Sequence, residues 1–262
     1  MSPLRPAYKV ILMVVILVQG FLSGAQAQGD KDIRVLERGK AIEREITGGE
    51  VHTYEFSVSA GQYLYAAVEE RGINLIIRLF GPDGKLLIEV DTLATSGPVT
   101  EHVPWIAGAS GAHRLEVSPR RNNAVKRGYV ISMKELRDAT AQDSSRVLAE
   151  QALLEAQAIE AKAATGELRM EATKKYEKAR DLFREIGASD REMWSLSRIG
   201  FQYGTLTQYH KALDIFGQQL TLARSLGHRR SEASALFNTA AMYIELGEQQ
   251  RAIDMYLELL PV

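Results

Sequence analysis

Apolar and polar positions follow two different periods along the chain, and the period changes near residue 140. From Ile33 to about Leu136 the pattern alternates, and the segment HTYEFSVS sets Tyr54, Phe56 and Val58 on one face. A period of two residues is typical of a half-buried β-strand. Further strand candidates are YLYAAVEE, NLIIRLF, KLLIEVD, HRLEVS and YVISMKE, separated by turns such as GPDGK. About seven to nine short strands without a helix predict an antiparallel sandwich or barrel.

From Asp143 onward the apolar positions recur at helical spacing, and glycine and proline become rare. The segment SSRVLAEQALLEAQAIEAKAA predicts a long helix, with Ser144 or Ser145 as its N-cap. We therefore expect a multidomain β + α chain. A jelly-roll-like antiparallel β-sandwich would occupy residues 32–137, and an α-helical solenoid would occupy residues 144–262.

The helical half repeats itself at a spacing of about 40 residues, and we call the resulting alignment the repeat register. Three of the repeated features are an aromatic residue at 203 and 243, alanine at 212 and 252, and glycine at 187 and 227. The units fall at about 150–187, 190–227 and 230–262, each a pair of helices. Gly187 and Gly227 suit helix C-termini, and Ser189 with Glu192 predicts a capping box at the next helix.

The repeat resembles the tetratricopeptide repeat (TPR) in the segments IGFQYGTLTQYHKALDIFGQQL and TAAMYIELGEQQRAIDMYLELL. Gly200 and Ala240 match its small position, where two helices come close. Thr207 and Gln219 depart from the usual glycine and alanine. The repeat length is similar to that of the longer repeats in bacterial multi-repeat proteins and kinesin light chains.

The resemblance implies a concave groove lined by the first helix of each pair, where a protein or peptide partner binds. Apolar side chains in this groove would suit an apolar helix or an extended peptide. A neighbouring repeat or a further part of the chain could equally cover them. The implied lining residues are Trp194, Ser197, Phe201, Thr205, Ser234, Phe237, Ala241 and Ile244.

The first half resembles bacterial pre-peptidase C-terminal-like domains in the segment GGEVHTYEFSVSAGQYLYAAVEERGINLIIRLFGPDGK. Such a sandwich followed by TPRs is similar to the N-terminal part of bacterial proteins that end in a CHAT domain, a caspase-like peptidase. That peptidase uses a Cys/His pair, and this chain contains no cysteine. Its activity is therefore not carried over.

The N-terminus predicts export. Arg5 and Lys9 precede a short apolar run, VILMVVILV, and small residues follow up to Ala27. This order is that of a secretory signal peptide at residues 1–27 with cleavage after Ala27. We therefore expect a secreted or periplasmic protein. The alternative is a membrane anchor formed by residues 10–26, and no other membrane contact is expected.

Composition and candidate chemistry do not indicate an enzyme. The net charge of −1 gives no reason to expect a nucleic-acid partner. No Ser/His/Asp ordering, phosphate-binding loop or metal-ligand spacing stands out, so we expect no catalytic residue, cofactor or metal. His102 and His113 lie on candidate neighbouring strands and could meet, whereas His210 and His228 are expected to be solvated. Asp83 and Asp91 could contribute to a calcium site, and the basic segment PRRNNAVKR is expected to be a solvated hairpin tip.

The function expected from these features is a non-catalytic, extracytoplasmic interaction scaffold. One alternative is the truncated regulatory portion of a CHAT peptidase, and another is a sandwich that binds a glycan or matrix protein. The final segment QQRAIDMYLELLPV matches the second helix of a repeat, yet no helix follows it in this sequence. We therefore interpret it as an interrupted array, or as an apolar edge where a partner or a second copy docks.

Overall fold

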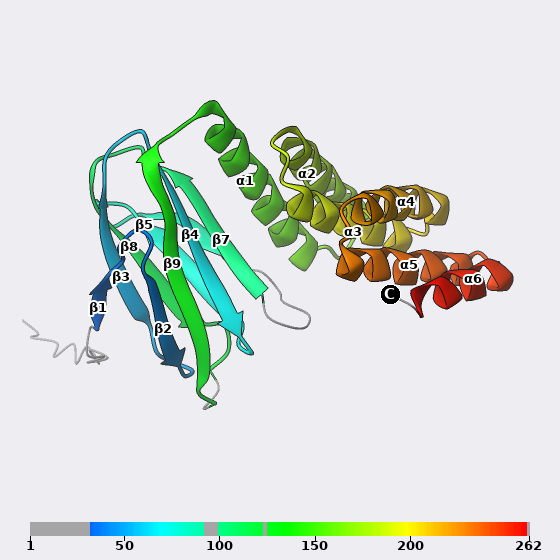
Figure 1. The fold of residues 1–262 in the computed structure, drawn as a ribbon, viewed down its shortest axis with the longest axis horizontal. Helices are drawn as coiled ribbons and strands as arrows, with labels where there is room; N and C mark the ends of the chain where they lie inside the picture. The colour runs from blue at the N-terminus through cyan, green and yellow to red at the C-terminus, as the bar shows by residue number, and fades with distance from the viewer. Residues whose placement is uncertain (1–31, 92–98, 123–124, 261–262) are drawn as a thin grey trace, which may run out of the picture. The chain divides into compact units, whose positions relative to one another are not determined.

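A computed structural model of the chain describes residues 32–91, 99–122 and 125–260, and it holds nine strands followed by six helices (Figure 1). The predicted signal segment lies outside these residues. Among the described residues, no helix combines the length and the apolar character needed to cross a bilayer.

The strands form two sheets with the orders β1-β3-β8-β5-β6 and β2-β9-β4-β7. Neighbouring strands are antiparallel except for β1, which pairs parallel to β3. The bounds are Ile33–Val35 (β1), Ala41–Ile46 (β2), His52–Val58 (β3), Gln62–Arg71 (β4), Leu75–Phe80 (β5), Leu86–Val90 (β6), Val99–Ile106 (β7), Gly111–Pro119 (β8) and Arg127–Asp138 (β9).

The alternation that predicted the strands decides which side chains enter the core. Tyr54, Phe56 and Val58 are all buried, together with Leu115 of β8 and Ile131 of β9, in one apolar cluster. Burial of these alternating apolar side chains removes them from water and holds the sheets together. The predicted fold class, an antiparallel sandwich followed by helices, is confirmed.

The prediction that His102 and His113 lie on neighbouring strands is wrong. β7 is the edge strand of the four-stranded sheet, and β8 lies inside the five-stranded sheet. Nδ1 of His102 is 2.7 Å from the hydroxyl of Tyr65, whereas Nδ1 of His113 is 3.2 Å from the carbonyl oxygen of Gly111. Each histidine thus has its own local partner.

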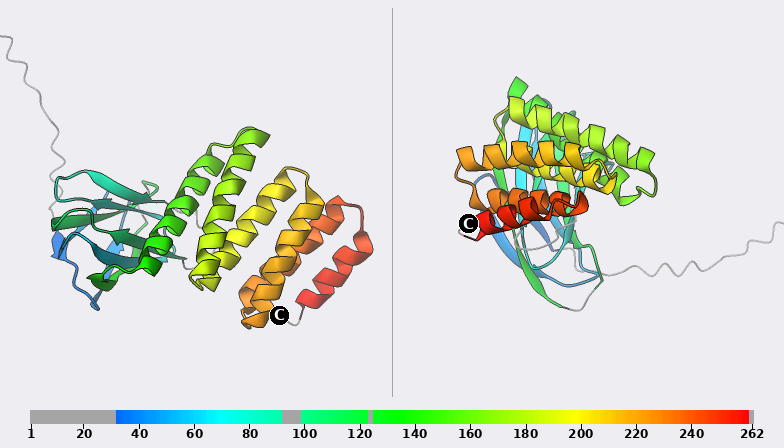
Figure 2. Two further views of the ribbon diagram at one scale, coloured as in Figure 1. Left: turned by 90° about the horizontal axis from the view of Figure 1, so that it is seen from above. Right: turned by 90° about the vertical axis from the view of Figure 1, so that its right-hand side faces the viewer.

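The helices form three consecutive antiparallel pairs, and Figure 2 shows them side by side. The second pair begins at Ser189 and the third at Arg229, a spacing that agrees with the repeat register. The bounds are Ala141–Ala161 (α1), Gly166–Glu185 (α2), Ser189–Thr205 (α3), Tyr209–Ser225 (α4), Arg229–Glu245 (α5) and Gln249–Leu259 (α6).

Helix capping differs from the prediction at two places. The N-cap of α1 is Thr140 rather than Ser144 or Ser145, because Thr140 and Asp143 form a reciprocal capping box. The box predicted for Ser189 and Glu192 does not form, since Ser189 already lies inside α3 and Glu192 accepts a hydrogen bond from Arg184. The positive φ angles of Gly187 (71°) and Gly227 (65°) agree with their predicted place at helix C-termini.

The outer face of the four-stranded sheet carries buried side chains. On β4, Leu64, Ala66 and Val68 join the sandwich core, so Tyr63 and Ala67 point outward, yet they are only 1% and 6% exposed. Helix α1 contacts the neighbouring strand β7, and its Leu154 packs against the sandwich core cluster. Helix α1 therefore covers part of the outer face of the four-stranded sheet.

Candidate interaction face

The eight residues expected to line a groove lie on α3 and α5, the first helices of the second and third pairs. Phe201 and Phe237 are 51% and 54% exposed, and Ile244 is similarly exposed. Thr205 and Ser234 are exposed, whereas Ser197, Ala241 and Trp194 are half-buried. The sequence therefore places large apolar side chains in solvent on these two helices.

Trp194 packs against other side chains of the helical region. Its ring packs edge-on against the ring of Tyr176 from α2, with the centroids 6.0 Å apart. The guanidinium of Arg198 lies 5.9 Å from the centre of the Trp194 ring and 5.1 Å from that of Phe201. This arginine therefore lies within cation–π distance of both rings.

Arg198 is also paired with a carboxylate from the first repeat. Its guanidinium forms an ion pair with Glu160 of α1. The hydroxyl of buried Tyr176 donates a hydrogen bond of 2.5 Å to the same carboxylate. Because Glu160 accepts from both groups, the charge of Arg198 is compensated within the protein.

Glu160 occupies the position that Gly200 and Ala240 hold in the next two repeats. In the second repeat the small residue is required, since a Cβ added at Gly200 would lie within van der Waals overlap of the Phe216 ring. In the first repeat a hydrogen bond between Glu160 and Tyr176 replaces this close contact. The pairing of Glu160 with Tyr176 was not predicted, although the repeat register aligns Tyr176 with Phe216.

The third repeat presents Phe237 together with Tyr256 of α6. Their ring centroids are 6.0 Å apart in an edge-on arrangement. Phe237 thus keeps half of its surface in solvent while the other side rests on α6. Tyr256 itself is half-buried, whereas Ile253 and Leu260 at the same end of the chain are 49% and 80% exposed.

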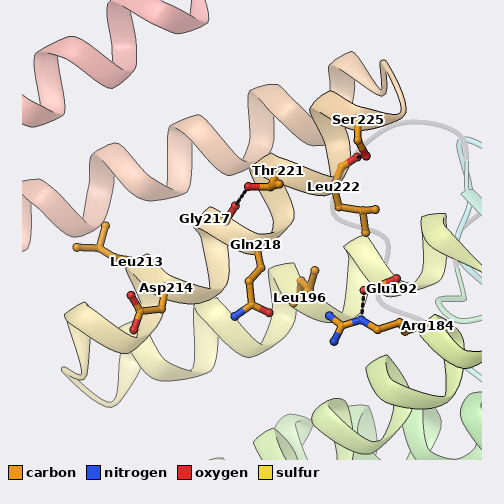
Figure 3. Close-up of a pocket in the computed structure, with 10 residues that line it drawn as sticks. All are labelled: Arg184, Glu192, Leu196, Leu213, Asp214, Gly217, Gln218, Thr221, Leu222 and Ser225. Atoms are coloured by element: carbon orange, nitrogen blue, oxygen red, sulfur yellow. Dashed lines mark hydrogen bonds and ion pairs between the residues drawn. The ribbon is translucent and has the colours of Figure 1, made fainter.

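A surface pocket of about 680 Å³ lies on a different side of α3 (Figure 3). Glu192 and Leu196 contribute to it from α3, and at about 100° per residue they point away from the side that carries Trp194 and Phe201. Most of its remaining residues belong to α4. The ion pair between Arg184 and Glu192 lines it, so these two charged groups already have partners.

The titratable groups that the sequence singled out have structural partners or lie in solvent. No group of three or more histidine, aspartate or glutamate residues is placed to hold a metal ion in the described part of the chain. Asp83 pairs with Lys85, and Asp91 pairs with Arg120. His228 accepts a hydrogen bond from the Ser231 amide, and its side chain is still 41% exposed.

Glu70 is a buried carboxyl inside the sandwich. Burial raises its pKa to about 8, and its oxygen accepts a hydrogen bond of 2.7 Å from the amide of Leu75. A carboxyl with a raised pKa is a feature of some catalytic sites. Here the group ties the end of β4 to the start of β5, which is a structural role.

Comparison with known proteins identifies repeats in the second and third helix pairs. The sequence model of the tetratricopeptide repeat family matches residues 191–262, which hold most of α3 and all of α4 to α6. This region therefore carries tetratricopeptide repeats, as predicted. No curated protein matches the chain.

Several solved structures are similar to separate halves of the chain. The TPR domain of Arabidopsis FLU has a TM-score of 0.38 and 16% identity, and the match covers 45% of this chain and 95% of that domain. The pre-peptidase C-terminal domain of collagenase from Bacillus anthracis has a TM-score of 0.31 and 15% identity, with 40% and 96% covered. For PliG of Aeromonas hydrophila, a periplasmic lysozyme inhibitor, the values are 0.29 and 16%, with 39% and 98% covered.

Tetratricopeptide repeats are generally non-catalytic and bind protein partners. The class of function indicated by residues 191–262 is therefore that of a protein-interaction scaffold.

Proposed function

We propose that the protein is an extracytoplasmic, non-catalytic scaffold that binds a protein or peptide partner on the face formed by α3 and α5. The observation that carries this proposal is the exposure of Phe201 and Phe237 within the repeat region. Apolar side chains that are left in solvent on one face indicate an interaction site. Aromatic side chains are also frequent contributors to binding energy.

Trp194 is a poor position for testing the proposed site by mutation. Trp194 packs on buried Tyr176, so its removal would disturb the helix packing as well as any binding. Phe201 and Phe237 are the better probes, because each is exposed over about half of its surface. We expect the paired change Phe201→Ala plus Phe237→Ala to leave the fold intact.

Capture of partners from the extracytoplasmic fraction tests the proposal. Wild-type protein should retain one or a few proteins that the double variant loses. The matched control is Leu86→Ala, which removes an equally exposed apolar side chain from the sandwich. Equal capture by wild type and double variant would contradict the proposal.

Export is proposed on the N-terminal sequence alone, where basic residues, an apolar run and small residues follow one another up to Ala27. The test is cell fractionation, followed by sequencing of the N-terminus of the isolated protein. We expect an extracytoplasmic protein that begins at Gln28. A cytoplasmic protein with an intact N-terminus would contradict this part of the proposal.

A further inference from the structure

The pocket of Figure 3 has a counterpart one repeat later in the chain. The repeat register pairs its lining residues with residues about 40 positions further on. Among those with a described equivalent, five keep their chemistry, in the pairs Arg184/Arg224, Glu192/Glu232, Leu196/Leu236, Leu213/Ile253 and Asp214/Asp254. Two differ, because Leu257 takes the place of Gly217 and Glu258 takes the place of Gln218. Two equivalent places in the helical region are therefore lined differently.

In the later copy the arginine is bound by two carboxylates. The guanidinium of Arg224 on α4 lies 2.8 Å from an oxygen of Glu232 on α5 and 3.1 Å from an oxygen of Glu258 on α6. Leu257, the neighbour of Glu258, adds an aliphatic side chain at the position that corresponds to Gly217. Helix α6 thus supplies both a carboxylate and an apolar group at this place.

In the earlier copy α4 supplies neither group. Among the described residues, Arg184 has one carboxylate partner, Glu192 of α3, at an Nε–Oε1 distance of 2.6 Å. Gln218 stands where a second carboxylate would be, and the Arg184 side chain is 53% exposed. A Cβ added at Gly217 would meet no atom within 4 Å, so this position opens onto free space.

The pocket has an apolar floor and ends of different charge. Leu196 is buried, and Leu213 and Leu222 are half-buried. Asp214 lies at the end of the pocket away from Arg184 (Figure 3), so an acidic group is favoured at the Arg184 end. A carboxylate at that end would give Arg184 the second charge-assisted hydrogen-bond partner that its counterpart already has within the protein.

We propose that this pocket binds a segment of a partner protein in which an aliphatic side chain lies next to a glutamate or an aspartate. The carboxylate of the segment pairs with Arg184, and the aliphatic side chain lies over Gly217 on the apolar floor. The segment thereby supplies what Leu257 and Glu258 supply one repeat later. The site goes beyond the proposed function, because the pocket lies on a different side of α3 from the exposed phenylalanines.

Peptide selection on the full chain with Phe201→Ala plus Phe237→Ala tests this inference, since this variant lacks the apolar side chains of the proposed function. The probe is a displayed library of random peptides, and the selected peptides are then titrated by fluorescence anisotropy. We expect selected sequences with an acidic residue beside leucine, isoleucine or valine. Replacing that acid by its amide should weaken binding about tenfold. Affinity should also fall as salt is added.

Matched substitutions on α4 then locate the site. Gln218→Glu gives Arg184 a carboxylate from its own chain and should weaken binding by about tenfold or more, whereas Gln218→Ala should change it by less than about twofold. Gly217→Leu should weaken binding by a similar factor, because the new side chain occupies the pocket. Gly217→Ala adds a Cβ in free space and should change affinity by less than about twofold. Circular dichroism of each variant checks that the helices are intact.

Three results would overturn the inference: no peptide is selected, the selected peptides lack an acidic residue, or Gln218→Glu and Gly217→Leu bind them as tightly as the parent chain does. Equal losses in Gln218→Ala and Gln218→Glu would also overturn it, because the added charge would then have no effect of its own. None of these results bears on the proposed function, whose two phenylalanines are absent from the parent chain. Loss of partner capture without Phe201 and Phe237 tests the proposed function alone.

Discussion

The first and the last helix of the helical region differ in what covers them. Helix α1 packs against α2 on one side and against the sandwich on the other. Helix α6 packs against α5, and its Leu257 and the adjoining Leu260 are 58% and 80% exposed. Similar amphipathic sequences thus have different surroundings. The difference teaches that the repeat pattern specifies helix pairing, whereas a second domain decides which face stays open.

The largest effect is expected from overpacking inside the repeats. Ala212 and Ala252 are equivalent buried positions on α4 and α6. Ala212→Trp should destabilise the helical region by roughly 1–3 kcal/mol or more, because α4 is enclosed by α3 and α5. Ala252→Trp should cost less, since α6 can shift outward.

Chemical denaturation followed by far-ultraviolet circular dichroism measures both free energies of unfolding. Two equal losses would mean that α6 is as confined as α4. Unchanged unfolding in both variants would show that the repeat register is wrong.

Paired leucine substitutions compare the two ends directly. Leu154→Ser removes an apolar contact between α1 and the sandwich and should cost about 1–3 kcal/mol. Leu257→Ser removes an exposed side chain of α6 and should change stability by less than about 0.5 kcal/mol. Differential scanning calorimetry gives both values, and similar losses would contradict the account of a covered and an open end.

A smaller loss of stability is expected from breaking the ion pair of Glu150 with Arg191 near α1. Glu150 is buried and Arg191 is mostly buried, so Glu150→Gln leaves an arginine without its partner and should cost about 1–2 kcal/mol. The exposed pair of Arg251 with Glu248 at the α6 end is the control, and Glu248→Gln should cost under about 0.5 kcal/mol. Urea denaturation of both variants at low salt measures the two losses of unfolding free energy. A larger loss for Glu248→Gln than for Glu150→Gln would contradict this prediction.

A further expected effect is on acid stability, through Asp143 at the start of α1. The side chain of Arg137 donates bonds of 2.6 and 2.9 Å to its carboxylate and lowers the pKa of Asp143 from 3.8 to about 2. A lowered folded-state pKa adds stability above the unfolded-state pKa, and this stability is lost as pH falls from about 4 to 2. Wild type should therefore be more stable than Asp143→Asn at pH 6, and the difference should shrink by pH 2. A difference that does not change over this range would contradict the assignment.

The sequence predicted the periods well because each period depends on local burial. The alternation around Tyr54 and the register of Gly200 with Ala240 both follow from which side chains must leave water. Helix starts were less predictable. Thr140 rather than Ser144 caps α1, because the side chain of Asp143 accepts a hydrogen bond from the backbone of Thr140 and completes a capping box.

Contacts between distant segments were the least predictable part. The sequence placed His102 and His113 on neighbouring strands, but the order of strands in the sheets depends on pairing over long separations. The ion pair of Glu160 with Arg198 and the contact of Leu154 with the sandwich join residues from different elements, and no periodicity contains that information. The eight residues of the face were inferred from the repeat alone, and their role in binding stays a prediction.

The most direct test of the central claim is site-specific photo-crosslinking between the full chain and the proteins of the extracytoplasmic fraction. A photoreactive amino acid is introduced in place of Phe201, Phe237 or Leu257 in three separate variants of the full chain. The account predicts crosslinks from the first two positions, on α3 and α5, and only background from Leu257 on the exposed side of α6. Crosslinking mainly from Leu257 would contradict it, because the open end of the helical region would then be the binding surface.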